Sequence, residues 1–103
     1  MVTGAEDIDP GQPSGGKHEF ILFVSGMSIK SLAAIENFNA IYNEYLKDHA
    51  NFQIIDIGNE KAMAVQFGIV AIPTLIRIEP HPIRTLVGDL SNKEKVLNYL
   101  GIT

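Results

Sequence analysis

The sequence predicts an α/β fold with the element order βαβαββα, a four-stranded mixed sheet and helices on both faces. Two short, mainly apolar runs, "FILFV" and "FQIIDI", flank a stretch with helical spacing. Strands joined by a crossover helix pair in parallel, with a right-handed connection. Two later apolar runs, "TLIRI" and "IRTLV", are separated by only a short turn, which predicts an antiparallel pair. A helical pattern ends the chain.

The first half of the predicted fold is the parallel βαβ unit. Residues 20–24 form a continuous apolar run, typical of a strand that is covered on both faces. Residues 28–47 repeat apolar side chains at helical spacing, and residues 52–57 form the second strand. The predicted apolar face of this helix comprises Leu32, Ile35, Phe38, Ile41, Tyr42, Tyr45 and Leu46. Tyr42 and Tyr45 are expected at the core margin, with hydroxyls that reach water.

A short second helix, "EKAMAVQF", leads into the antiparallel pair. Asn59 is its predicted N-cap, and Gly68 is the predicted C′ residue, where a left-handed conformation ends the helix. In the antiparallel pair, Pro80 and Pro82 frame the turn between the two strands. The pair therefore adds two strands to the sheet that the βαβ unit begins.

The last helix is predicted over residues 92–100. The sequence "SNKE" before it reads as a capping box, in which Ser91 bonds the first-turn amides and Glu94 reaches back. Gly101 stops the helix. Gly88 is expected to supply a positive φ in the turn that precedes it.

Composition limits the possible functions of this chain of 103 residues. Residues 1–17 are rich in Gly and Pro and poor in aliphatic side chains, so we expect a flexible tail before a single domain at residues 18–103. The net charge of −4 argues against binding nucleic acid or an anionic membrane. The absence of cysteine excludes disulfides and thiol chemistry. We expect a cytoplasmic protein without a cofactor, since neither a signal peptide nor a membrane span is visible.

The segment "IPTL" resembles the start of the third strand in thioredoxin-like domains. In those domains the proline is cis and lies beside a Cys-x-x-Cys, so a cis bond is expected before Pro73. Aligning "FVSGMSIKS" with their first loop and helix places Ser28 and Ser31 at the two cysteine positions. Serine cannot form a disulfide, and its hydroxyl is a poor nucleophile without a base. We therefore expect Ser28 to cap the helix and Ser31 to lie in its first turn.

The chain is more closely similar to the circadian clock KaiB family. The blocks that carry this resemblance are "FVSG", "FQIIDIG", "VAIPTLIRIEP" and, above all, "RTLVGDLSNKEKVLNYL". The input domain of the clock histidine kinase SasA looks similar too. The KaiB resemblance implies a protein that is not an enzyme. It would dock on a KaiC-type ATPase ring, compete there with the kinase domain, and help to sequester KaiA where that protein exists.

KaiB proteins are also known to switch fold, which is possible when two packings differ by a few kcal/mol. The alternative state of the family is tetrameric and differs in its C-terminal half. Here Ile29 stands where the family usually has Pro, Ala33 where it often has a basic residue, and "EKAMAVQFGIVAI" is unusually apolar. We therefore expect the thioredoxin-like state to be the stable one, in a divergent member tied to signalling such as a stress response.

The resemblance also implies site residues. The block Gly88, Asp89, Leu90 and Ser91 would form the turn that takes part in a fold switch. Asp89 and Lys93 are the candidate contacts with a partner. An exposed turn Asp is equally ordinary, and charges such as Lys93 and Lys95 on a short terminal helix are usually only solvated.

Other interpretations stay open. His18, His49 and His81 lack the spacing of a metal site and are expected to be solvated. Two alternative functions remain: a cysteine-less thioredoxin-like adaptor for another protein, and a glutathione-binding domain that would use Pro73, Thr74 and Ser91. The second rests on the attraction of a helix N-terminus for a carboxylate. A homo-oligomer, dimer or tetramer, is also possible, because edge strands can pair.

Overall fold

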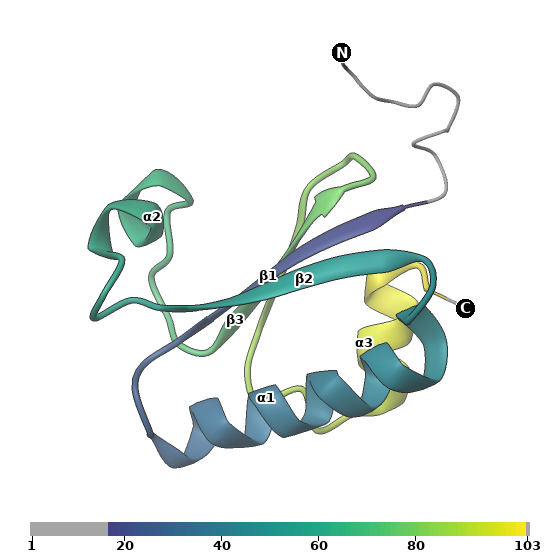
Figure 1. Cartoon of the computed structure of the whole chain (residues 1–103), viewed down its shortest axis with the longest axis horizontal. Helices are drawn as coiled ribbons and strands as arrows, with labels where there is room; N and C mark the ends of the chain where they lie inside the picture. The colour runs from purple at the N-terminus through teal and green to yellow at the C-terminus, as the bar shows by residue number, and fades with distance from the viewer. Residues whose placement is uncertain (1–16, 103) are drawn as a thin grey trace.

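A computed structural model of the chain describes residues 17–102 (Figure 1). Its elements are β1 (His18–Val24), α1 (Ile29–Ile41), a π-helical turn η2 (Tyr42–Leu46), β2 (Ala50–Asp56), α2 (Lys61–Gln66), β3 (Thr74–Glu79), β4 (Arg84–Val87) and α3 (Lys93–Leu100). This is the predicted element order, with a π-helical end on the first helix. The predicted tail, residues 1–17, lies outside the described residues except for Lys17.

The four strands form one mixed sheet in the order β2-β1-β3-β4. β1 pairs in parallel with β2, and β3 is antiparallel to both β1 and β4. The predicted parallel pair and antiparallel hairpin are both confirmed. No helix within residues 17–102 is long and apolar enough to cross a bilayer.

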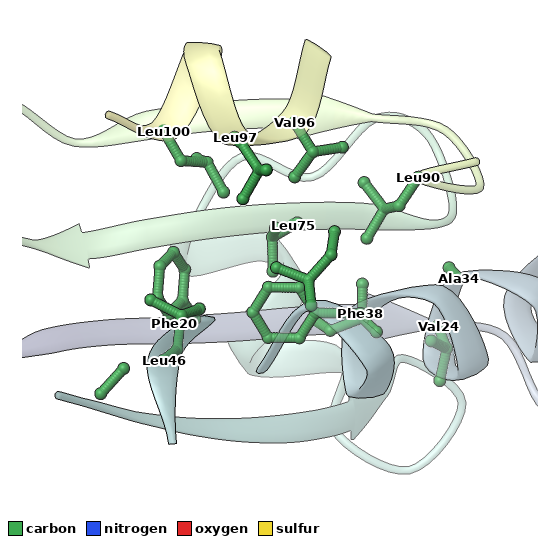
Figure 2. Close-up of a cluster of buried hydrophobic side chains, with 13 residues drawn as sticks. Phe20, Val24, Ala34, Phe38, Leu46, Leu75, Leu90, Val96, Leu97 and Leu100 are labelled. Carbon is green, nitrogen blue, oxygen red and sulfur yellow. The ribbon is translucent and has the colours of Figure 1, made fainter. Parts of the chain in front are cut away.

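Helices cover both faces of the sheet, as predicted. In Figure 1, α1 and α3 lie on one side of the sheet and α2 lies on the other. The larger core packs the first face with α1 and α3, around Phe20, Phe38 and Leu75 (Figure 2). The smaller core lies under α2, where Phe23 and Ile76 contact partly buried side chains of that helix and the loop after it.

The predicted apolar face of the first helix is confirmed except at Leu32. Phe38, Ile41 and Leu46 are buried, and Ile35, Tyr42 and Tyr45 pack against the larger core, whereas Leu32 is 43% exposed. The helix also buries Ser31, whose hydroxyl accepts the main-chain amide of Ser25.

Tyr42 lies half-buried at the margin of the larger core, as predicted. Its hydroxyl donates to the carbonyl oxygens of Ala50 (3.1 Å) and Lys47 (3.4 Å), and its ring centroid lies 4.9 Å from that of Phe52. The hydroxyl therefore ties the end of the π-helical turn to β2.

Two predicted helix caps are wrong for a common reason. Glu60 precedes α2, without a side-chain cap, because the Asp56 carbonyl accepts the amides of Asn59 and Glu60 (both 3.0 Å) and holds Asn59 in the turn. α3 begins one residue late: the Asp89 carboxylate accepts the Ser91 amide (3.0 Å), and Asn92 becomes the N-cap. Glu94 then stands one position too early to complete the capping box. In both turns an oxygen of a preceding Asp accepts an amide near the expected start of the helix. The acceptor is the main-chain carbonyl of Asp56 in the first turn and the carboxylate of Asp89 in the second.

The predicted end of α2 is confirmed. Gly68 has a φ of +66°, its amide donates to the carbonyl of Val65, and the amide of Ile69 donates to that of Ala64 (2.9 Å). This is the Schellman arrangement, which suits a glycine because the left-handed conformation costs it no side-chain clash.

Candidate functional site

The loops that carry the predicted site residues meet at one end of the sheet. Phe23 at the end of β1 pairs with Thr74 at the start of β3, and Thr74 pairs with Val87 at the end of β4. The Gly88 amide donates to the Pro73 carbonyl (2.9 Å), and this bond joins the turn after β4 to the loop before β3. The sheet therefore brings the start of α1, the loop before β3 and the turn after β4 to the same end.

The two serines that we aligned with the cysteine positions of thioredoxins hold the first loop in place. The Ser28 hydroxyl accepts the Ser31 amide (3.2 Å), which confirms Ser28 as the N-cap of α1. Ser31 lies in the first turn, as predicted, but is fully buried, and its hydroxyl accepts the Ser25 amide (3.0 Å). Both hydroxyl oxygens therefore serve the main chain, and the pair shapes the loop that would carry thiols in a thioredoxin.

Asp56 is a further site residue that sequence reasoning missed. Its carboxylate accepts the Gly26 amide (3.1 Å) and the Gly58 amide (2.8 Å), so it bridges the loop after β1 and the loop after β2. An Asp at the end of a strand, one residue before an Ile-Gly pair, was the available signal, because aspartate commonly accepts amides in turns.

The predicted cis bond before Pro73 is confirmed, and Pro73 is buried. The hydroxyl of the neighbouring Thr74 donates to the Ala71 carbonyl (2.6 Å), and Thr74 is 2% exposed. Together with the Ser91 amide, which already bonds Asp89, these contacts occupy the polar groups that a bound glutathione would need. This geometry speaks against the glutathione alternative.

Large apolar side chains are exposed around this frame. Met27 is 80% exposed and Ile29 86%, on the loop and first turn of α1, and Val70 is 95% exposed in the loop before Pro73. Val87 is 56% exposed and lines a shallow groove with Val70. We call these four residues the end-of-sheet surface. Exposed apolar side chains gathered on loops that hydrogen bonds hold in place are typical of a protein-binding surface.

The turn at Gly88, Asp89, Leu90 and Ser91 borders this surface. Gly88 has the predicted positive φ (+128°), and Leu90, buried in the larger core, also has a positive φ (+63°). The Asp89 carbonyl accepts the Asn37 side-chain amide (2.8 Å), which ties the turn to α1. Hydrogen bonds from Ser91 lower the pKa of the Asp89 carboxyl, so its charge is held in the turn.

Lys93 lies apart from this end. Its ammonium pairs with Glu44 (3.3 Å) and lies 5.6 Å from the centre of the Tyr45 ring, so it connects α3 to the π-helical turn. The hydrogen bond and the charge of Glu44 raise the pKa of Lys93. Because both side chains are about half exposed, this pair contributes little to stability.

Of the three histidines, His49 and His81 are exposed as predicted, whereas His18 is partly buried. Its Nδ1 is buried without a partner among the described residues, because the ring stacks on Phe20 (5.9 Å between centroids). Within residues 17–102, no three His, Asp or Glu side chains gather as a metal site would require.

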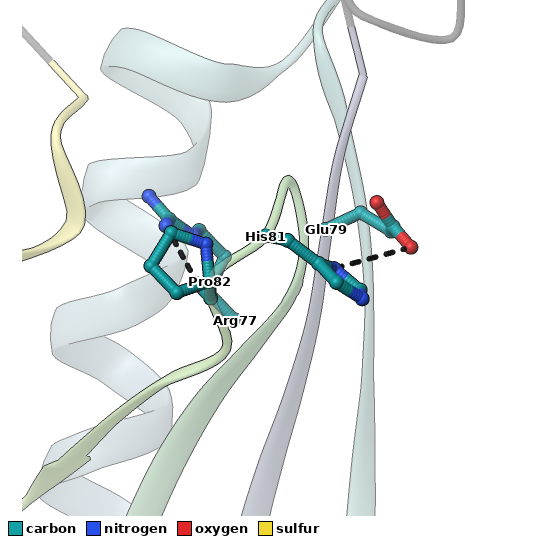
Figure 3. Close-up of polar contacts among 4 residues, drawn as sticks. All are labelled: Arg77, Glu79, His81 and Pro82. Carbon is teal, nitrogen blue, oxygen red and sulfur yellow. Dashed lines mark hydrogen bonds and ion pairs between the residues drawn. The ribbon is translucent and has the colours of Figure 1, made fainter.

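Arg77 is the other buried polar residue that the sequence did not reveal. It is 6% exposed, and its guanidinium donates to the carbonyls of Leu100 (2.6 Å) and Pro82 (2.9 Å). Figure 3 shows it reaching the turn of the β3–β4 hairpin, where His81 pairs with Glu79 (3.7 Å). Arg77 thus fastens the C-terminus of α3 to the hairpin, at a position where the helix dipole favours a cation.

His18 predicts a pH dependence of stability. Burial, and next the charge of Arg77, lower the pKa of His18 below 6.5. The folded state therefore favours the neutral ring, and its contribution is complete above pH 6.5 and is lost as the pH falls through the folded pKa. We expect denaturant midpoints to fall as the pH is lowered below about 6.5. His18→Phe, which retains the stacking, should flatten this fall, and an unchanged slope would contradict the assignment.

Taken together, the fold and the two serines define a thioredoxin-like domain that has kept its frame without thiols. The chain belongs to the KaiB family: the family model described as KaiB domain matches residues 21–102. The circadian clock protein KaiB3 of Synechocystis sp. is 41% identical over 81 residues, which cover 79% of each chain. The circadian clock oscillator protein KaiB of Thermostichus vulcanus is 37% identical over 76 residues, 74% of this chain and 70% of that one.

Solved structures agree with this fold. The N-terminal domain of SasA from Synechococcus elongatus superposes with a TM-score of 0.69 at 18% identity, over 96% of both chains. A chloroplastic thioredoxin z superposes with a TM-score of 0.71 at 14% identity, over 84% of this chain and 79% of that one. These identities are low, so the two structures support the thioredoxin-like fold alone.

Proposed function

We propose that this protein is a non-catalytic, cytoplasmic docking module that binds a KaiC-type ATPase ring and modulates its signalling. The observation that carries the proposal is the match to the KaiB domain over residues 21–102, which is nearly the whole described chain. The likeness to the SasA N-terminal domain supports a competitor: a histidine kinase with a similar domain would bind the same ring site.

We further propose that the end-of-sheet surface contacts the ring. Hydrogen bonds of Ser28, Ser31 and Asp56 fix the loop that carries Met27 and Ile29, and the bond between the Gly88 amide and the Pro73 carbonyl holds the loop after Val70, so binding would order little additional backbone. Its exposed side chains are apolar and bulky, which suits the centre of an interface. The proposed role of this surface thus follows from both its rigidity and its exposure.

Lysine substitutions in this surface should weaken binding. We expect Ile29→Lys and Val70→Lys each to raise the Kd for the ring about tenfold or more, because each places a charge in an apolar contact. Ile83→Lys is the matched control, since Ile83 is 54% exposed but precedes β4 at the opposite end of the sheet. Titration by biolayer interferometry measures the three values. Equal Kd values for all variants would exclude this surface.

Asp89, which borders the end-of-sheet surface, and Lys93, which lies apart from it at the start of α3, remain proposed polar contacts with the ring. Asp89→Asn keeps an oxygen acceptor for the Ser91 amide and removes only the charge. We expect this variant and Lys93→Gln to slow association several-fold at low salt, with a smaller difference at high salt, because rim charges act mainly on the association rate. Association rates measured at two salt concentrations test this, and rates equal to those of the unmodified chain would remove both residues from the interface.

We also propose that the thioredoxin-like state is the stable state of this chain. The contact of Asn37 with Asp89 supports it because it joins the C-terminal half to α1, and the contact of Arg77 with Leu100 supports it because it joins β3 to α3 in the thioredoxin-like arrangement of that half. Amide chemical shifts report the test: one set, with strand shifts at residues 84–87, is expected. A second, slowly exchanging set would reveal a fold-switching chain.

A further inference from the structure

Met27 places a thioether at the tip of the loop between β1 and α1. The Ser28 amide donates to the Ser25 carbonyl (3.2 Å) and closes a turn over residues 25–28, in which Gly26 has a positive φ (+51°). Met27 follows Gly26 in this turn and is 80% exposed. A Cβ added to Gly26 would meet nothing within 4 Å among the described residues beyond its chain neighbours. The turn therefore presents the Met27 side chain to solvent.

The composition of the chain directs oxidants to methionine. The chain has neither cysteine nor tryptophan, so its three methionines are its most readily oxidised side chains. Met63 is partly buried on α2, where it packs against the smaller core. Met1 lies outside the described residues. Because an oxidant must reach the sulfur atom, Met27 should react before Met63.

We propose that Met27 is an oxidation site, and that its sulfoxide weakens docking through the end-of-sheet surface. This role rests on the proposed docking function, since Met27 is one of the residues of that surface. Hydrogen peroxide supplies the oxygen. A lone pair of the sulfur attacks one peroxide oxygen, the O–O bond breaks, and the proton of the attacked oxygen passes to the leaving hydroxide, which departs as water. The sulfur is oxidised to the sulfoxide as the peroxide is reduced.

The sulfoxide weakens docking because it puts a polar oxygen into an apolar contact. Burying an oxygen acceptor without a donor has a free-energy cost. The main-chain amides of residues 25, 26, 28 and 31 already donate to oxygens of Ser31, Asp56, Ser25 and Ser28. These amides are therefore not available to the new oxygen when a partner covers the loop.

The fold beneath the turn should survive this oxidation. Met27 belongs to neither hydrophobic core, and the bonds that hold its loop use hydroxyl, carboxylate and main-chain groups, which peroxide does not oxidise. The modification is also reversible, because methionine sulfoxide reductases remove the oxygen as water while a dithiol is oxidised to a disulfide. Oxidation of Met27 is thus a reversible control on docking rather than damage to the fold.

Peptide mass spectrometry tests the selectivity of the site. Trypsin separates the methionines into three peptides, residues 1–17, 18–30 and 62–77. After brief treatment of the folded chain with hydrogen peroxide, the peptide with Met27 should gain an oxygen several-fold faster than the peptide with Met63. In urea the two rates should converge, since both side chains are then exposed. Equal rates in the folded chain would overturn the proposal.

Titration against a KaiC-type ring tests the consequence. Catalase removes the peroxide before the ring is added, so only the chain is oxidised. The Kd of the unmodified chain should rise about tenfold after oxidation and return after treatment with the reductases. Met63→Leu should show the same rise, whereas Met27→Leu should have the same Kd before and after peroxide. Each variant is compared with itself, because Met27 belongs to the surface.

The outcomes separate this proposal from the docking function. If the untreated chain binds the ring and the oxidised chain binds equally well, the oxidation site is excluded as a control and the docking function stands. The same holds if Met27→Leu remains as sensitive to peroxide as the unmodified chain. If the untreated chain does not bind the ring at all, the docking function fails, and the proposed control fails with it.

Discussion

Phe38→Ala is expected to lower the free energy of unfolding by about 3–5 kcal/mol, the usual cost of deleting a buried phenyl ring. Phe38 is fully buried, and its ring meets those of Phe20 (5.3 Å between centroids) and Phe52 (5.1 Å) edge to face. The ring thus joins α1 to both strands of the parallel pair. Urea unfolding followed by circular dichroism measures the change.

The matched control for this prediction is Val65→Ala. Val65 is 81% exposed on α2, so its truncation should change stability by less than about 0.5 kcal/mol. Because domains of this size are commonly stable by about 5–15 kcal/mol, Phe38→Ala would remove a large share of the total. A loss below about 1 kcal/mol would mean that Phe38 does not occupy the centre of the larger core.

Arg77→Met is expected to destabilise the protein by about 2–3 kcal/mol. The substitution removes both donors to the Leu100 and Pro82 carbonyls and leaves them without these partners. It also removes the cost of burying a guanidinium, so the loss should be smaller than the two charged hydrogen bonds alone suggest. Thermal and urea unfolding at pH 7 provide the measurement.

Arg77→Lys separates the charge from the geometry. Lysine keeps a cation near the C-terminus of α3 but cannot reproduce the fork that spans two carbonyls. We expect a stability between those of the unmodified chain and of Arg77→Met. If Arg77→Met proved as stable as the unmodified chain, the hydrogen bonds of the Arg77 guanidinium to the end of α3 and to the hairpin turn would not stabilise the fold.

The sequence predicted the sheet well because its strands are marked locally. Short apolar runs, the helical spacing between two of them and the two-proline turn are sufficient to define a mixed sheet. Helix starts were less predictable, since the choice between Ser91 and Asn92 depends on which amide the Asp89 carboxylate captures. The burial of Ser31 was likewise not predicted, because its hydroxyl finds its partner, the Ser25 amide, in the loop before the helix.

The residues of the candidate site also fall into those that the sequence located and those that it did not. The resemblance to thioredoxin-like domains located Ser28, Ser31 and Pro73, and the sheet brings them to one end. The exposure of Met27, Ile29 and Val70 was not predicted, because it is set by which neighbours the fold supplies. The burial of His18 and Arg77 is equally non-local: the partners of Arg77 are two carbonyls, at positions 82 and 100, which sequence patterns do not mark.

The central claim is that this chain docks on an ATPase ring. Size-exclusion chromatography with light scattering, on a mixture with a KaiC-type ATPase in ADP, tests it most directly. We expect the chain to co-elute with the ring at a mass above that of the ring alone, and an added kinase domain of the SasA type to displace it. If the chain elutes separately at every ratio and nucleotide state, the docking function is contradicted.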